Sequence, residues 1–323
     1  MAVLANTFET YESVGIREDL ADVIYDISPT DTPFMSNIPK TTSKGTFHEW
    51  QKDALEAPAD TPVSEGAEAA ILALTPTVRL GNYTQIASKA ARISGTDLVA
   101  DNAGRQSEMA YQMAKKGLEI RNDIEYTLVA ANKGYNAGNP ETTGAGDVPR
   151  EVATLHAWFS SAESDIAGDG VAAVGDGSDG FTDGTARDFT EDMLTAAHQA
   201  TWVAGGDPSI IMCGATLKTA ITGFTGNATK YKEVDDKKII NAVDVYVSDF
   251  GELMVVPNRW MRATDVFLLQ PDTWAYATHR DFLNWDLAKT GDSEAKQILT
   301  EYTMEARSAE ANFFIGDLQK AAA

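Results

Sequence analysis

The chain has 323 residues, 43% of them hydrophobic and 23% charged, which is an ordinary composition for a globular protein with a sizeable core. Its 48 acidic and 26 basic residues give a formal net charge of −22, which argues against tight nonspecific binding to nucleic acid and against an anionic membrane surface. No apolar run of about 18 residues is present, so no transmembrane helix is expected, and the first residues lack the basic and apolar regions of a secretory signal.

Residues 1–40 predict an arm. Apolar residues at helical spacing predict a short amphipathic helix over 16–24, after which Pro29, Pro33 and Pro39 interrupt regular structure. Four apolar side chains lie around these prolines: Ile27, Phe34, Met35 and Ile38. An extended segment with apolar side chains favours contact with another subunit, and packing against its own domain is the alternative.

Residues 41–95 predict a long β-hairpin loop. Strands are expected at about 46–53, anchored by Phe47 and Trp50, and at about 77–87. The segment 54–75 between them contains four acidic residues and no Lys or Arg, so we expect a mobile acidic tip. An isolated two-stranded ribbon is only marginally stable in water, so the hairpin is expected to lie on a neighbouring subunit.

A long amphipathic helix is predicted over 106–132, capped by Asp101 or Asn102. Five apolar residues define its buried face: Met109, Met113, Ile120, Ile124 and Leu128. Three more are expected to widen that face: Tyr111, Ala114 and Leu118. The methionines in this stripe are interpreted as core residues, not as a cofactor pocket.

The remainder predicts alternating helices and strands, as in an α/β domain. Helices are expected over 150–166, 190–203 and 215–224, and strands over 209–213, 243–247, 252–256 and 266–269. A strongly alternating strand closes the chain at 298–307. One of its faces (Ile298, Thr300, Tyr302, Met304 and Ala306) is expected to pack on the long helix, and the other to remain exposed.

Motifs for chemistry are weak, and no catalytic, cofactor-binding or metal-binding residue is predicted. The run 175–180 matches the dinucleotide pattern G-x-G-x-x-G, but its two aspartates would repel a pyrophosphate. The surrounding Asp- and Gly-rich segment fails the spacing of an EF-hand calcium loop. The histidines, at 48, 156, 198 and 279, form no metal motif, and the single cysteine, Cys213, lies in an apolar run typical of a buried strand.

A resemblance to a known family becomes specific in three stretches: TFETYESVGIREDLADVIYDISPTDTPFMSNIPKTTSKGTFHEWQKDAL, VSDFGELMVVPNRWM and EYTMEARSAEANFFIGDL. They resemble the tailed-bacteriophage major capsid proteins, over nearly the whole chain and least over 134–184. The resemblance implies an α+β fold of the Hong Kong 97-like capsid type. Its parts would be an N-terminal arm (1–40), an extended hairpin loop lying over a neighbour (41–95), a peripheral domain with a long spine helix (96–149), an axial α/β domain (150–271) and peripheral return strands with the C-terminus (272–323).

The same resemblance implies a non-enzymatic subunit that assembles with itself, as pentamers and hexamers, into an icosahedral head shell around double-stranded DNA. Assembly is expected in the host cytoplasm, and the product is the virion capsid. Portal and decoration proteins are expected partners, together with a separate scaffolding protein because the chain starts almost directly with the arm; a membrane is not.

Contact with packaged DNA is expected to be weak and nonspecific. Five basic residues are candidates for touching phosphates: Lys40, Lys44, Lys115, Lys116 and Arg121. Pairing with nearby carboxylates such as Glu119 and Glu125 is the competing expectation for those on the helix. Two alternative functions remain open from the sequence: an encapsulin-type nanocompartment shell, which shares the fold, and an acidic cytoplasmic enzyme of unknown reaction.

Overall fold

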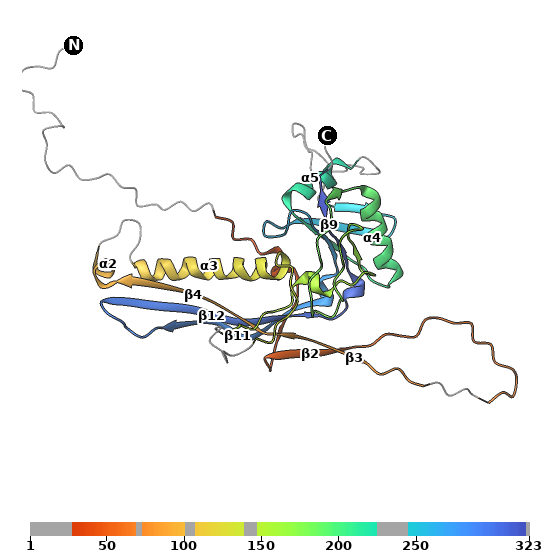
Figure 1. Ribbon diagram of the computed structural model, residues 1–323, viewed down its shortest axis with the longest axis horizontal. Helices are drawn as coiled ribbons and strands as arrows, with labels where there is room; N and C mark the ends of the chain where they lie inside the picture. Colours follow the sequence, from red (N-terminus) through yellow and green to blue (C-terminus); the bar gives the residue numbers. More distant parts are fainter. Residues whose placement is uncertain (1–27, 69–72, 101–106, 139–146, 225–244, 321–323) are drawn as a thin grey trace, which may run out of the picture.

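The computed structural model describes residues 28–68, 73–100, 107–138, 147–224 and 245–320, so the helix expected over 16–24 lies outside the described residues. The described part has three regions (Figure 1). One is a long layer in which a helix lies along a sheet. The second is a more compact sheet with two helices, which lies at one end of that layer. The third is a hairpin near the same end, whose loop projects away from the layer.

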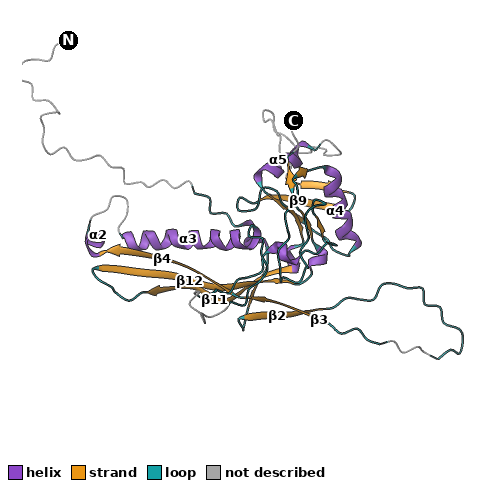
Figure 2. Ribbon diagram, in the orientation of Figure 1, coloured by secondary structure: helices purple, strands orange, loops and turns teal. Residues whose placement is uncertain are grey.

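The long layer is a four-stranded sheet with one face covered by helix α3 (Glu108–Val129) (Figure 2). Its strands, in spatial order, are β1 (Lys40–Thr42), β11 (Trp274–Asp286), β12 (Ser293–Ala306) and β4 (Gln85–Ser94). β12 pairs antiparallel with both β11 and β4, and β1 is parallel to β11. Strand β11 was not predicted from the sequence, because a polar run over 278–281 interrupts its apolar pattern.

Helix α3 is shorter at both ends than the predicted range 106–132. Its cap is Ser107, not Asp101 or Asn102: the Ser107 hydroxyl accepts a hydrogen bond from the amide of Ala110. All five predicted stripe residues are buried, from Met109 to Leu128. The stripe is narrower than predicted, because Leu118 is 42% exposed and Ala114 is exposed too. A short helix, α2 (Gly95–Val99), precedes α3.

The closing strand β12 begins at Ser293, earlier than predicted, and its expected packing on α3 is confirmed. Tyr302 and Met304 share a hydrophobic cluster with Ile120 and Ile124 of α3. Met109 and Met113 form a separate cluster with Ile93 of β4, and Ile298 of β12 packs against it. The expected exposure of the other face is wrong at this end of the strand, where three residues are buried: Glu301, Thr303 and Glu305. The base of the hairpin covers them.

The predicted hairpin divides into two structures. β2 (Phe47–Lys52) and β3 (Val78–Tyr83) pair antiparallel, but the strand expected to run on through residue 87 breaks at Thr84, and β4 joins the long layer. The Thr84 amide donates the last hairpin bond to the Thr46 carbonyl, and its hydroxyl donates to Glu301. The chain therefore changes sheets at one buried threonine.

The arm corrects another expectation. Residues 33–37 form the short helix α1 (Pro33–Asn37), and Phe34 and Ile38 are buried in the subunit's own main cluster, with the Phe34 ring edge-on to Trp274. This part of the arm therefore packs on its own subunit, and not on a neighbour as preferred from the sequence. Ile27 lies outside the described residues.

The second sheet has the strand order β5–β13–β10–β7–β9–β8. Its strands are β5 (Ser164–Asp165), β7 (Ile210–Cys213), β8 (Val245–Ser248), β9 (Gly251–Pro257), β10 (Val266–Leu269) and β13 (Phe313–Ile315). Helices α4 (Glu191–Val203) and α5 (Ala215–Gly223) pack on it through a second cluster that includes Leu194 and Leu217. A separate pair is formed by β6 (Arg187–Asp188) and β14 (Leu318–Gln319).

The helix predicted over 150–166 is wrong. Only Leu155–Trp158 is helical, as the 3₁₀ turn η1. The run 152–159 is buried throughout, so its apolar spacing reflects enclosure on all sides and not one face of a helix. Two further 3₁₀ turns lie at η2 (Pro271–Thr273) and η3 (Ala309–Ala311).

We expect Tyr302→Asp to destabilise the subunit by about 4 kcal/mol or more, because it places a charge between α3 and β12 where Tyr302 stacks on Tyr276. Tyr302→Phe keeps the ring and is expected to cost about 1 kcal/mol. Denaturant unfolding measures both. Similar costs for the two variants would contradict the packing described here.

Candidate assembly surfaces

The groups that could carry chemistry are dispersed and already partnered. No group of three or more His, Cys, Asp or Glu side chains in the described ranges is placed to hold a metal ion. Burial raises the pKa of the Cys213 thiol to about 12, which leaves it a poor nucleophile. Each histidine has a separate contact: His48 with Glu305, His156 with Asp265, His198 with Ser248 and His279 with the carbonyl of Ser43.

The Asp- and Gly-rich loops use their carboxylates internally. Asp176 accepts from Ser178, and Asp179 accepts from the amide of Val174. Gly177 has a φ of +83°, and a Cβ there would lie 2.7 Å from the Trp158 ring, so glycine is needed for close packing. The glycines of the 175–180 run thus have a structural explanation within the loop.

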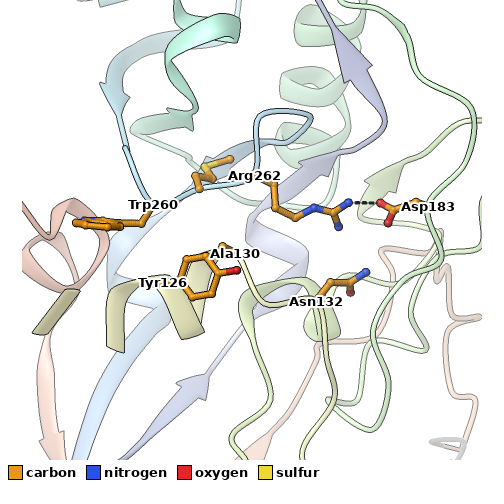
Figure 3. Close-up of a pocket in the computed structure, with 7 residues that line it drawn as sticks. Tyr126, Ala130, Asn132, Asp183, Trp260 and Arg262 are labelled. Carbon is orange, nitrogen blue, oxygen red and sulfur yellow. Dashed lines mark hydrogen bonds and ion pairs between the residues drawn. The ribbon is translucent and has the colours of Figure 1, made fainter. Parts of the chain in front are cut away.

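A pocket of about 510 Å³ opens between the end of α3 and the segment 260–262 (Figure 3). Its lining consists of Tyr126, Ala130, Asn132, Asp183, Trp260, Met261 and Arg262. The Arg262 guanidinium pairs with Asp183 and lies 3.5 Å from Asp265, so its charge is already compensated. The lining residues present no nucleophile beside a base.

The base of the hairpin is fixed to its own subunit. Trp50 donates from Nε1 to the Ala306 carbonyl (2.8 Å) and its ring lies 5.4 Å from that of Trp158. Lys52 pairs with Glu310 near the end of β2. The sequence-based expectation of a hairpin without support therefore fails for β2 and β3, which lie on the buried end of β12.

Glu301 is the polar centre of this junction. Its carboxylate accepts from the Thr84 hydroxyl, the Arg150 guanidinium and Arg280 Nε, each at 2.7 Å. Burial by itself would raise the pKa of Glu301, but these donors outweigh burial and hold the pKa below its usual range. The hairpin base, the start of the 150–159 run and β11 are thus joined through one ionised side chain.

Beyond β2 and β3, the hairpin is a bare loop. The described residues between them, 53–68 and 73–77, are all exposed, and the loop projects away from the body (Figure 1). It carries four acidic side chains: Glu56, Asp60, Glu65 and Glu68. Three large apolar side chains are also exposed on it: Leu55 at 99%, Val63 at 74% and Leu74 at 96%. We call residues 54–75 the acidic tip.

A second exposed surface lies at the far end of the long sheet, on the face opposite α3. Ile298 packs toward α3, so its neighbours Gln297 and Leu299, with Trp285 and Leu283 paired to them, face the other way. Four apolar side chains form this open sheet face, with exposures of 38–56%: Leu283, Trp285 and Leu287 toward the far end, and Ile86 opposite Glu301, where the face begins. Exposed Arg92 of β4 and Lys289 beyond β11 border it.

The basic residues predicted to approach phosphates have mixed surroundings. Lys116 pairs with Glu119 (2.8 Å), as the competing expectation held. Glu125 does not pair with a helix cation: its carboxylate is buried and accepts from backbone amides of the arm. Lys115 is exposed, as are Lys40 and Lys44 near the arm, and Arg121 lies over the Phe282 ring.

Among the described helices, none is long and apolar enough to cross a bilayer.

A family model and a named relative both identify this chain with phage major capsid proteins. A family model described as SU10 major capsid protein matches residues 3–319. A protein named major capsid protein, from Escherichia phage Phieco32, is 26% identical over 330 aligned residues, which cover 93% of this chain and 94% of that protein.

Solved structures share the fold. The Cyanophage A-1(L) capsid asymmetric unit has a TM-score of 0.65 at 13% identity, covering 96% of this chain and 98% of that one. A capsid chain of the native GTA particle has a TM-score of 0.61 at 13% identity, covering 96% of each chain. At these identities the likeness shows the fold alone, and the predicted α+β, Hong Kong 97-like capsid fold is confirmed.

The pKa of Glu301 leads to a pH prediction. We expect Glu301→Gln to cost about 2 kcal/mol at pH 7, correcting the mild effect that an exposed position would have given. Because the folded-state pKa is depressed, this contribution is present above the ordinary glutamate pKa of about 4.3 and is lost as pH falls through the folded value. Unfolding titrations at pH 7 and pH 4 should therefore show a smaller difference from wild type at pH 4. Exposed Glu294→Gln is the control, and a Glu301 difference that grows toward low pH would refute the network.

Proposed function

This chain belongs to the SU10 major capsid protein family and is a major capsid protein of a tailed bacteriophage, and we propose that two of its surfaces, the acidic tip and the open sheet face, join neighbouring copies in the icosahedral shell. The observation that carries this proposal is the projecting tip. Its described residues are all exposed, although β2 and β3 beneath them pack against the main core cluster through Trp50 and Leu80.

The two surfaces match in chemistry. The acidic tip has four carboxylates and three exposed apolar side chains, and the open sheet face has apolar side chains bordered by Arg92 and Lys289. They lie toward opposite ends of the long layer (Figure 1), which leaves both accessible, and in this proposal the tip of one subunit meets the sheet face of another copy. Apolar contact supplies affinity, and opposite charge favours this register over tip-to-tip contact.

The division into parts follows the same proposal. Residues 1–40 form the arm, 41–95 the hairpin loop together with strand β4, which joins the long sheet, and 96–149 with 272–323 the peripheral domain. Residues 150–271 form the axial domain, which gathers in pentamers and hexamers. The C-terminal stretch also returns to the axial part, because β13 pairs with β10 there.

We propose no enzymatic activity and no membrane partner, with assembly in the host cytoplasm. Scaffolding, portal and decoration proteins are the proposed further partners. Packaged double-stranded DNA is touched only by weak contacts that salt disrupts, because the subunit carries a net charge of −22. Exposed Lys115 is one place for such contact.

Replacing residues 54–75 with a short Gly-Ser turn should abolish shells and spare the subunit. The described residues of this range, 54–68 and 73–75, are exposed, so the unfolding free energy should change by less than about 1 kcal/mol. Light scattering and negative-stain microscopy compare the variant with the full chain, which should close shells with five-fold and six-fold rings. Normal shells from the variant would exclude the tip as a joint, and a full chain that stays monomeric would overturn the shell proposal.

Trp285→Asp tests the receiving surface. Trp285 is 56% exposed, so stability should change by about 0.5 kcal/mol or less, while shell yield should fall at least tenfold. Val174→Asp is a matched control, since Val174 is an apolar residue of similar exposure (64%) on a loop that belongs to neither surface. Equal yields from the two variants would rule out the open sheet face.

A further inference from the structure

Helix α1 in the arm is held by a side chain from another helix. Glu125 of α3 is fully buried, and its Oε1 accepts from the Phe34 amide (2.7 Å) while Oε2 accepts from the Met35 amide (3.0 Å). These amides belong to the first turn of α1, where backbone donors have no partner within the helix. Thr32 occupies the capping position, but its side chain makes no capping bond. Glu125 therefore does what a capping residue would do.

The carboxylate is also held from the second sheet. Asn258, which follows β9, donates from Nδ2 to Glu125 Oε1 (2.7 Å), and its Oδ1 accepts from the Trp260 amide (2.9 Å). The Trp260 indole then donates to the carbonyl of Asp31 (2.8 Å). Arm, long helix and second sheet thus meet in one closed circuit of hydrogen bonds.

This arrangement sets where the arm goes. A five-residue helix is too short to be stable alone, so α1 depends on its contacts. Phe34 and Ile38 anchor the arm in the core, but both lie within or after α1, and neither side chain orients the residues before the helix. The two amides gripped by Glu125, with the Asn122 side chain donating to the carbonyl of Pro29 (3.0 Å), direct residues 29–33 along α3.

We propose that Glu125 is a positioning residue for assembly, which fixes the direction of the N-terminal arm over residues 29–35. The proposal rests on the proposed shell function for its consequence, because a misdirected arm would fail to meet neighbouring copies. The hydrogen bonds from Glu125 to the amides of α1, which we call the latch, lie within one subunit and are measurable without assembly.

Glu125→Gln tests the latch. The side-chain NH₂ of glutamine is a donor and would face a backbone N–H, which is also a donor. At least one of the two hydrogen bonds from the Phe34 and Met35 amides should therefore be lost. Hydrogen–deuterium exchange on the unassembled subunit should show exchange over residues 33–38 at least about tenfold faster than in wild type, with β12 unchanged. Glu119→Gln, on the same helix but in a partly exposed ion pair that does not touch the arm, is the control and should leave the arm unchanged.

The outcomes separate the latch from the shell. Unchanged exchange over 33–38 would overturn the proposal, and so would an equal rise across β12, which would mean a general loss of stability. If Glu125→Gln does not fold, Asn258→Ala removes one donor to the carboxylate and should loosen the same segment to a smaller degree. A loosened arm with normal shells would refute the role in assembly, whereas a wild-type chain that forms no shell would count against the proposed function alone.

Discussion

The structure depends on strand β12 being covered on both faces. On one face Tyr302 and Met304 pack against α3, and on the other the hairpin base closes over Glu301 and Glu305. The first contact is apolar and the second is polar, so they differ in kind. Apolar packing holds the long layer together, while the charged network fixes the hairpin in one orientation relative to it. A projecting loop has a defined direction only if its root is rigid in this way.

That rigidity explains how one chain can contain both a firm body and an unsupported loop. Trp50 and Lys52 secure the hairpin just before β2 ends, and beyond that point the described residues are exposed. The far end of the sheet shows the converse: its helix face is packed and its other face is bare. Both exposed surfaces lie at the extremities, where a copy of the same chain can reach them.

The sequence predicted the elements whose pattern matches a single environment. Helix α3 has one apolar face, and the strand over 210–213 is apolar on both faces; both elements were predicted and are present. Prediction from the sequence failed where a charged side chain is buried and where a segment is enclosed on all sides. Glu301 looked solvent-exposed because alternation alone cannot show that Arg150 and Arg280 cover it. The run 152–159 imitated a helix because every side of it is enclosed.

Whether the sequence could predict the contacts of the arm and the two assembly surfaces depended on a different factor, the distance along the chain between the residues involved. Phe34 was expected on a neighbour, because no local signal indicates that Glu125, 91 residues later, satisfies the amides around it. The acidic tip was recognised from composition, since a run without Lys or Arg and with few large apolar residues has little to bury. The open sheet face was not recognised, because it combines residues from β4 and β11 that only the register brings together.

The opposite placement of the tip and the open sheet face gives the subunit a polarity, because each copy would have one surface that gives and another that receives. Such a head-to-tail joint is not self-complementary, so it propagates until a ring closes. A copy without its tip would still accept the tip of the preceding copy and then offer nothing to the next. It would act as a chain terminator, and a small fraction of such copies mixed with intact ones would stop many rings from closing.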